Sequence, residues 1–148
     1  MLIETYISFT VREFIDTHNK SERCFGFFFV TEPRFKAFAS GGLRPSEYKD
    51  TSTPFRGKGK GLPTEFYSGV RCGILHNGET RNTWRIRRDS CCELLQISKN
   101  SKVIQANVFL NEMKMVLEEY REKLIAANPT SEQWLVCKEK IEYIIKKS

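Results

Sequence analysis

The sequence predicts a mainly α-helical fold, and three observations lead to this expectation. Apolar residues recur at helical spacing near the N-terminus, in the middle of the chain and over most of its last 42 residues, 107–148. Short segments typical of strands are confined to 83–106. The 148 residues, 40% hydrophobic and 28% charged, suit one globular domain spanning 1–148. We therefore expect a mostly helical domain with a small β-hairpin inserted before a long helix.

The first half of the chain contains an expected helix, an ambiguous segment and a long loop. "RCFGFFFVTEPRFKAFAS" (23–40) fits a buried strand or a buried helix equally well, because periodicity does not separate the two. "GGLRPSEYKDTSTPFRGKGKGLP" (41–63) is rich in Gly, Pro, Ser and Lys, which predicts a long loop. An apolar stripe predicts a first helix through Ile3, Ile7, Val11, Phe14 and Ile15.

The next expected helix runs from about Thr64 to His76, with Thr64 as its N-cap and Gly78 as its stop. Its apolar stripe consists of Phe66, Val70 and Ile74.

Two short strands, a turn and two helices are expected after that. "TWRIRRD" (83–89) and "CCELLQI" (91–97) have the composition of strands, and "SKNS" indicates a turn before "KVIQA". The pattern is helical again from Asn107 and is interrupted at Pro129. Ser131 can cap a last helix over 132–147, which ends in lysines, where the helix dipole favours positive charge.

Composition narrows the class of protein. The net charge of +6 and the pI near 9.1 favour polyanionic partners such as RNA or DNA. Five cysteines without regular spacing argue against a disulfide framework, and the absence of a CxxC pair together with two distant histidines argues against a metal site. "FRGKGKG" lacks the spacing of a P-loop, so no nucleotide cofactor is expected. The start of the chain lacks signal-peptide features and the longest apolar run is "FGFFFV", so we expect a soluble, cytoplasmic protein without a membrane anchor.

The stretch "YSGVRCGILHNGET" (67–80) contains the candidate site, because it places Arg71 and His76 in an otherwise apolar and small run. Either residue also has a structural interpretation. Arg71 can cover apolar neighbours with its aliphatic stem, and His76 can be stabilised by the helix dipole at the C-terminal end of its helix. Positions five apart lie about 140° apart around an ideal helix. The two side chains therefore share a face only if the helix end unwinds, or their counterparts come from a second chain.

"RCGILH", an Arg-x4-His motif late in a helix and before an Asn-Gly turn, resembles the motif of HEPN domains, helical proteins that include many metal-independent endoribonucleases. The context "HNGETRNTWRI" and "VFLNEMKMVLEEYREKL" is similar to small bacterial and plasmid-borne HEPN-like proteins, over roughly Phe66 to Leu124. The resemblance implies a HEPN-like helical bundle with Arg71 and His76 as catalytic pair. It also implies a homodimer whose two motifs face one cleft, and a role as a toxin or phage-defence effector with a possible antitoxin partner. Cys72 departs from the family pattern, in which the residue after the arginine is often polar.

These residue types suit RNA cleavage through the 2′-hydroxyl, which needs no metal. A histidine with a pKa near neutrality moves protons, and an arginine holds phosphate oxygens and stabilises developing charge. The alternatives are a catalytically silent HEPN-like module that binds RNA or a partner protein, and a plain interaction domain. A Cys72–His76 pair at i and i+4 would belong to a different enzyme class, but no oxyanion hole is evident near it.

RNA-binding candidates flank the motif. Arginines with an aromatic residue suit single-stranded RNA, although strand alternation can instead pack Trp84 and Ile86 inside and leave the arginines in solvent. Asn77 can contact substrate or simply form the turn. The candidates for contacting RNA are Asn77, Arg81, Trp84, Arg85, Arg87, Lys58 and Lys60.

Overall fold

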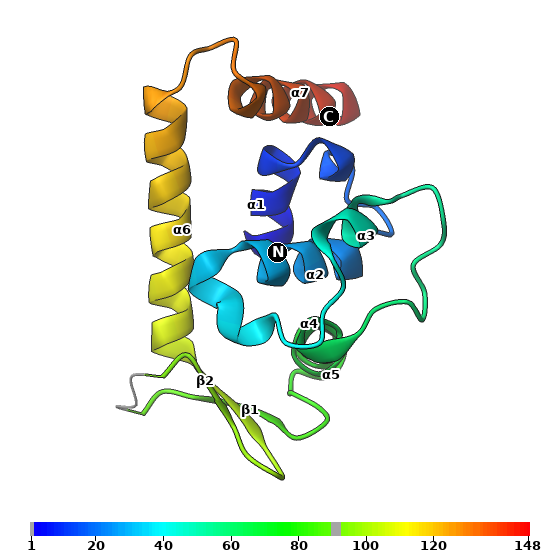
Figure 1. Cartoon of the computed structure of the whole chain (residues 1–148), viewed down its shortest axis with the longest axis vertical. Coiled ribbons are helices and arrows are strands. Elements are labelled where there is room, and N and C mark those ends of the chain that lie inside the picture. The colour runs from blue at the N-terminus through cyan, green and yellow to red at the C-terminus, as the bar shows by residue number, and fades with distance from the viewer. Residues whose placement is uncertain (1, 90–92) are drawn as a thin grey trace.

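A computed structural model describes residues 2–89 and 93–148, and these are mainly helical (Figure 1). The expected mainly α class is confirmed. The helices are α1 (Leu2–Thr10), α2 (Ser21–Thr31), α3 (Pro45–Lys49), α4 (Gly61–Phe66), α5 (Cys72–Asn77), α6 (Ala106–Ala126) and α7 (Glu132–Lys147). The strands are β1 (Trp84–Arg87), β2 (Leu95–Ile97) and β3 (Lys102–Gln105). Single 3-10 turns span Arg12–Phe14 and Pro33–Phe38, and a π-helical turn spans Tyr67–Arg71.

The ambiguous aromatic segment is helical and forms the centre of the core. It folds as α2 followed by a 3-10 turn, because Pro33 removes a backbone donor and ends the α-helix at Thr31. Its rings pack edge-on and stacked against each other and against Phe66 and Phe109. The fully buried phenylalanines of the segment are Phe25, Phe28, Phe29, Phe35 and Phe38.

The first helix is shorter than its apolar stripe. α1 ends at Thr10, and the stripe continues in the 3-10 turn that buries Phe14. α1 packs on α2 and on the C-terminal α7 (Figure 1). The two ends of the chain therefore stabilise each other through α1 and α7.

Residues 41–63 are not one continuous loop, because α3 forms within them. The buried Arg23 of α2 explains how this segment is held. Its guanidinium donates to the backbone carbonyls of Glu47, Tyr48, Asp50 and Thr53, and it lies 4.6 Å from the centre of the Phe55 ring. These contacts define an Arg23 clamp that ties the 47–53 backbone to α2.

The β segment is a three-stranded sheet of order β1-β3-β2 rather than a simple hairpin. The hairpin joins β2 to β3 through the expected 98–101 turn, in which Ser98 donates its backbone N–H to the Ser101 carbonyl at 2.8 Å. β1 pairs with β3 in parallel, with Trp84 opposite Lys102. Alternating residues identify a strand but not its partner, which is why the sequence suggested a single hairpin. The Cys91–Cys92 part of the expected second strand lies outside the described residues.

The two long C-terminal helices follow their apolar patterns closely. α6 runs along one side of the molecule and buries Met113 and Val116, and α7 crosses near its end (Figure 1). Ser131 occupies the N-cap position of α7, but its hydroxyl forms no cap hydrogen bond. Trp134 closes the α6–α7 corner by donating its indole N–H to the Leu124 carbonyl at 2.8 Å. Within the described residues, no helix has both the length and the apolar character to cross a membrane.

Candidate functional site

The Arg71–His76 motif lies on a continuous helical rod made of α4, the π turn and α5. The rod begins at Gly61 with Lys60 as N-cap, so the expected N-cap at Thr64 is wrong. It ends at Gly78, as expected: Gly78 has φ 72° and donates its N–H to the Ile74 carbonyl at 3.0 Å. π-helical turns inside α-helices are frequent at functional sites, and this one ends at Arg71.

Two glycines one turn apart allow the chain after the helix to fold back onto it. A Cβ atom at Gly69 would lie 2.5 Å from Cδ1 of Trp84, and one at Gly73 would lie 2.6 Å from the Glu79 carbonyl oxygen. The Gly69 carbonyl accepts a 2.7 Å hydrogen bond from the Arg81 backbone N–H. The segment 79–84 is therefore fixed against the motif helix, and Arg81 lies beside α5.

Arg71 is held within the fold rather than presented to solvent. Its Nη2 lies 3.4 Å from Oε1 of Glu4, its guanidinium lies 5.4 Å from the centre of the Tyr67 ring, and its side chain is 16% exposed. Its Nε is buried with no hydrogen-bond acceptor. The guanidinium is thus already paired with a carboxylate of α1.

Glu4 is the residue that the sequence interpretation missed. Its burial by itself would raise the carboxyl pKa, but the hydrogen bond from Ser21 and the positive charges near the carboxylate, to which Arg71 contributes a small part, together outweigh burial, so the pKa of Glu4 is lowered. The carboxylate is therefore a stable partner for Arg71 at neutral pH. No local signal connects the two, because they are 67 residues apart in the chain.

His76 lies at the end of α5 with an exposed side chain. Among the described residues, Arg71 and His76 have no contact with one another, as their spacing on a helix predicts. One chain therefore does not assemble the two side chains into a catalytic pair. Asn77 is the last residue of α5, and its side chain lies outside what the structure describes.

The basic flank beyond the motif is largely solvent-exposed. Arg81, Arg85, Arg87 and Arg88 are all exposed, and Arg87 has Asp89 at 3.8 Å. His76 and these four arginines are all exposed and lie within 76–88 of the chain, and we call this set the basic surface: His76, Arg81, Arg85, Arg87 and Arg88.

Trp84 does not belong to this surface. It is 3% exposed, stacks on Phe38 with ring centres 6.4 Å apart and fits against Gly69. The expectation that Trp84 contacts RNA is therefore corrected, because a buried ring has no face to offer a base. The alternative holds for Trp84, which packs inside while the arginines face solvent, but it is wrong for Ile86, which is 43% exposed.

The lysines of the glycine-rich segment lie in a different environment. Lys58 and Lys60 line a cavity of about 410 Å³ that is also lined by Glu47 and Asp50. Lys58 donates its Nζ hydrogen to the Thr53 hydroxyl at 2.7 Å. Two carboxylates beside two lysines weaken the attraction for a phosphate, so these lysines contribute less than the basic surface to anion binding.

Cys72 is half-buried beside the Tyr67 ring. Burial, together with the neighbouring Cys72 thiol, raises the pKa of the Tyr67 hydroxyl above its ordinary value. Tyr67 also lines a polar cleft of about 580 Å³ together with Glu22, Phe55 and Arg56. Tyr67, the residue whose ring Arg71 contacts, therefore also faces this polar cleft.

Within the described part of the chain, no three His, Cys, Asp or Glu side chains gather in a way that could hold a metal ion. Comparisons with protein-family models, curated proteins and solved structures gave no match to this chain.

Proposed function

We propose that this protein binds single-stranded RNA through its basic surface. The observation that carries the proposal is the set of four exposed arginines in 81–88, the segment that closely follows an exposed His76 in the chain. Arginine forks pair well with phosphate oxygens, and only Arg87 among the four has a carboxylate within 4 Å in the described residues. The net charge of +6 adds a long-range attraction for a polyanion.

We infer further that the bound RNA is cleaved without metal, in the manner of the HEPN domains that the Arg-x4-His motif resembles. His76 is the proton-transferring group, because its imidazole is exposed and imidazole is the side chain that most often acts as general acid or base. Arg71 is the group that stabilises the phosphorane. Arg71 and His76 of one chain are not brought together, so the active form requires a second copy whose motif faces the first, and it also requires Arg71 to leave Glu4.

The biological part of the proposal rests on the resemblance alone. It places the protein among toxin or phage-defence effectors, with an antitoxin as a possible protein partner. The competing function is a silent HEPN-like module that binds RNA or a protein and leaves RNA intact. The long ion pair that holds Arg71 away from His76 favours this second function.

The test is incubation of purified protein with labelled single-stranded RNA in EDTA, for the wild type and His76→Ala. The chain offers a matched control in His18→Ala, since His18 is its only other histidine and is also exposed. The enzyme proposal expects cleavage with 2′,3′-cyclic phosphate ends by the wild type and by His18→Ala, and a loss of at least about 100-fold in His76→Ala.

Three other outcomes distinguish the alternatives. RNA binding without cleavage by any variant identifies the silent module. Equal cleavage by the wild type and His76→Ala points to a contaminating nuclease, and a failure to bind RNA even at low salt rejects both proposals.

A further inference from the structure

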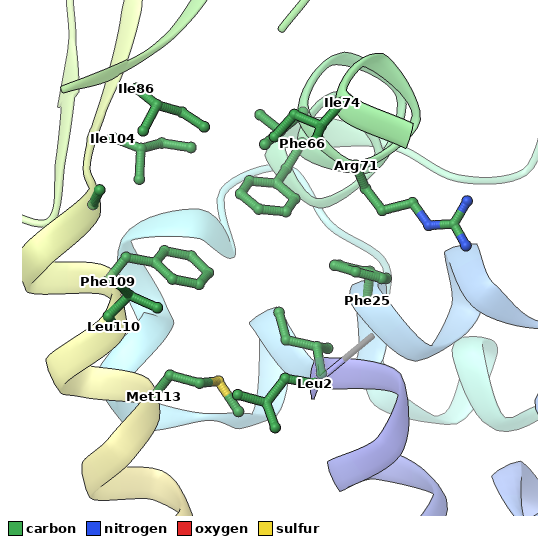
Figure 2. Close-up of a pocket in the computed structure, with 13 residues that line it drawn as sticks. Leu2, Phe25, Phe66, Arg71, Ile74, Ile86, Ile104, Phe109, Leu110 and Met113 are labelled. Carbon is green, nitrogen blue, oxygen red and sulfur yellow. The ribbon is translucent and has the colours of Figure 1, made fainter. Parts of the chain in front are cut away.

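An apolar cavity of about 300 Å³ opens between α1, α2, the motif helix, the sheet and α6 (Figure 2). Its floor is made of the buried side chains of Phe25, Phe66 and Met113. Figure 2 shows side chains from these elements pointing toward one another across the open space. The cavity is therefore enclosed from several sides and is more than a flat apolar face.

The mouth of the cavity is bordered by large aliphatic side chains that remain in solvent. They come from three helices and one strand: Leu2 is 49% exposed, Ile74 44%, Ile86 43% and Leu110 61%. Such side chains around an opening can cover a bound molecule that is otherwise buried on the floor.

Arg71 is the one charged residue among the described residues that line this cavity. Its aliphatic stem borders the hollow, while Figure 2 shows its guanidinium turned away from the other lining side chains. That guanidinium already has Glu4 as its partner at 3.4 Å. A charged group placed inside the cavity would consequently lose its hydration without gaining an ion pair.

We propose that this cavity is a binding site for an uncharged, apolar small molecule of about ten carbon atoms, in the size range of naphthalene or a medium-length alkyl chain. An apolar cavity of about 150 Å³ holds benzene, and this one has about twice that volume. Water is a poor occupant, because the one polar side chain of the lining, Arg71, turns its guanidinium away and the other lining side chains offer no hydrogen bonds. This inference is independent of the proposed action on RNA.

The experiment is a fluorescence titration of the full chain with naphthalene as the neutral probe, with n-butylbenzene as competitor. The anionic relative naphthalene-1-sulfonate, which carries the same rings, is titrated in parallel. The expected result is saturable binding of one neutral probe per chain, displaced by n-butylbenzene, and binding of the sulfonate at least about tenfold weaker. Equal or tighter binding of the sulfonate would overturn the proposal, because it would mean recognition of charge.

Ala106→Leu tests the location, because Ala106 lines the cavity at the start of α6 and the added atoms would fill it. Ala126→Leu is the matched control, since Ala126 is exposed at the other end of the same helix. We expect probe affinity to fall at least about tenfold in the first variant and to stay unchanged in the second. Unchanged affinity in both variants overturns the proposal.

Ile74→Trp provides a second filling variant at the exposed rim, where a larger side chain is tolerated without disturbing the floor. This variant is also expected to bind the probe more weakly than the wild type. Circular dichroism verifies that each variant is folded. Analytical ultracentrifugation at the titration concentrations measures whether the protein is a monomer or a dimer. If the dimer does not bind the probe and the monomer formed on dilution does, a second copy covers the cavity, and the small-molecule site is rejected.

Discussion

Arg71 has a side chain that suits catalysis, but in this structure it is engaged in an ion pair with Glu4. Its charge is neutralised by Glu4, and both side chains are largely withdrawn from solvent, at 16% and 10% exposure. An ion pair of this kind is costly to break from one side, because the remaining charge stays partly buried. The pair therefore contributes to holding α1 against the motif helix.

The Glu4→Gln substitution is expected to destabilise the fold by about 1–3 kcal/mol at pH 7, because it leaves the Arg71 guanidinium without its carboxylate. The pKa of Glu4 is lowered in the folded state, so the wild type should lose this contribution as the pH falls through the carboxyl range. Urea unfolding at pH 7 and at pH 3 measures both effects. The difference between wild type and variant should be large at pH 7 and small at pH 3.

Glu122→Gln on the exposed face of α6 is the matched control and should leave stability unchanged. A difference between wild type and Glu4→Gln that stays constant with pH would contradict the role assigned to the carboxylate.

At the scale of elements, the motif helix and the segment 79–84 behave as one unit. Gly69 and Gly73 leave room for a second stretch of backbone, and the Arg81 N–H to Gly69 carbonyl bond joins the two. β1 begins at Trp84, the last residue of this segment, and pairs with β3, so the position of the sheet depends on the fit at these glycines.

Gly69→Ala should destabilise the protein by about 1–3 kcal/mol, because the new methyl group would collide with the Trp84 ring and with the Arg81 carbonyl oxygen. Alanine normally stabilises a helix relative to glycine, by about 0.5–1 kcal/mol. A net loss of stability in Gly69→Ala would therefore be caused by the collision. Chemical denaturation followed by Trp fluorescence measures it.

Ser68→Ala is the neighbouring control, since Ser68 is exposed on the same π turn. It should change stability by less than about 0.5 kcal/mol. A stabilised Gly69→Ala variant would show that the 79–84 segment does not need this close approach.

Elements whose signals are local could be predicted from the sequence, and elements that depend on distant partners could not. The α6 stripe and the Gly78 stop follow from spacing and from glycine's tolerance of positive φ. The choice of helix for 23–40 required the surrounding aromatic core, and the parallel partner of β1 required knowledge of β3. At the candidate site, the exposed arginines could be expected from strand alternation. The Arg71–Glu4 pair could not, because no local pattern links α1 to residue 71.

For the molecule as a whole, the arginines differ in how they are engaged. Arg12 is paired with glutamates of α7 and Arg34 with glutamates of α6, whereas the four exposed arginines of 81–88 have only the Arg87–Asp89 pair among the described residues. Binding of RNA should therefore depend on the basic surface and on salt.

If the four arginines of the basic surface each neutralise one phosphate, the slope of log K against log salt should be about −3 for single-stranded RNA. Raising salt from 50 to 200 mM should then weaken binding by about 50-fold. Arg85→Gln should reduce the magnitude of the slope by about 0.7, and Arg121→Gln, on the exposed face of α6, should leave it unchanged. Fluorescence anisotropy with a labelled oligonucleotide measures each slope, and an equal effect of both substitutions would place the contacts elsewhere.

The Arg23 clamp has a consequence for how this protein tolerates change. Its acceptors are backbone carbonyls, which every amino acid possesses, so the grip on 47–53 does not depend on which side chains occupy those positions. Most substitutions at Thr53 or Asp50 would preserve the path of the backbone, whereas loss of the one arginine would release the whole stretch. The sequence of this segment can therefore vary while its backbone path continues to depend on a single residue of another helix, Arg23.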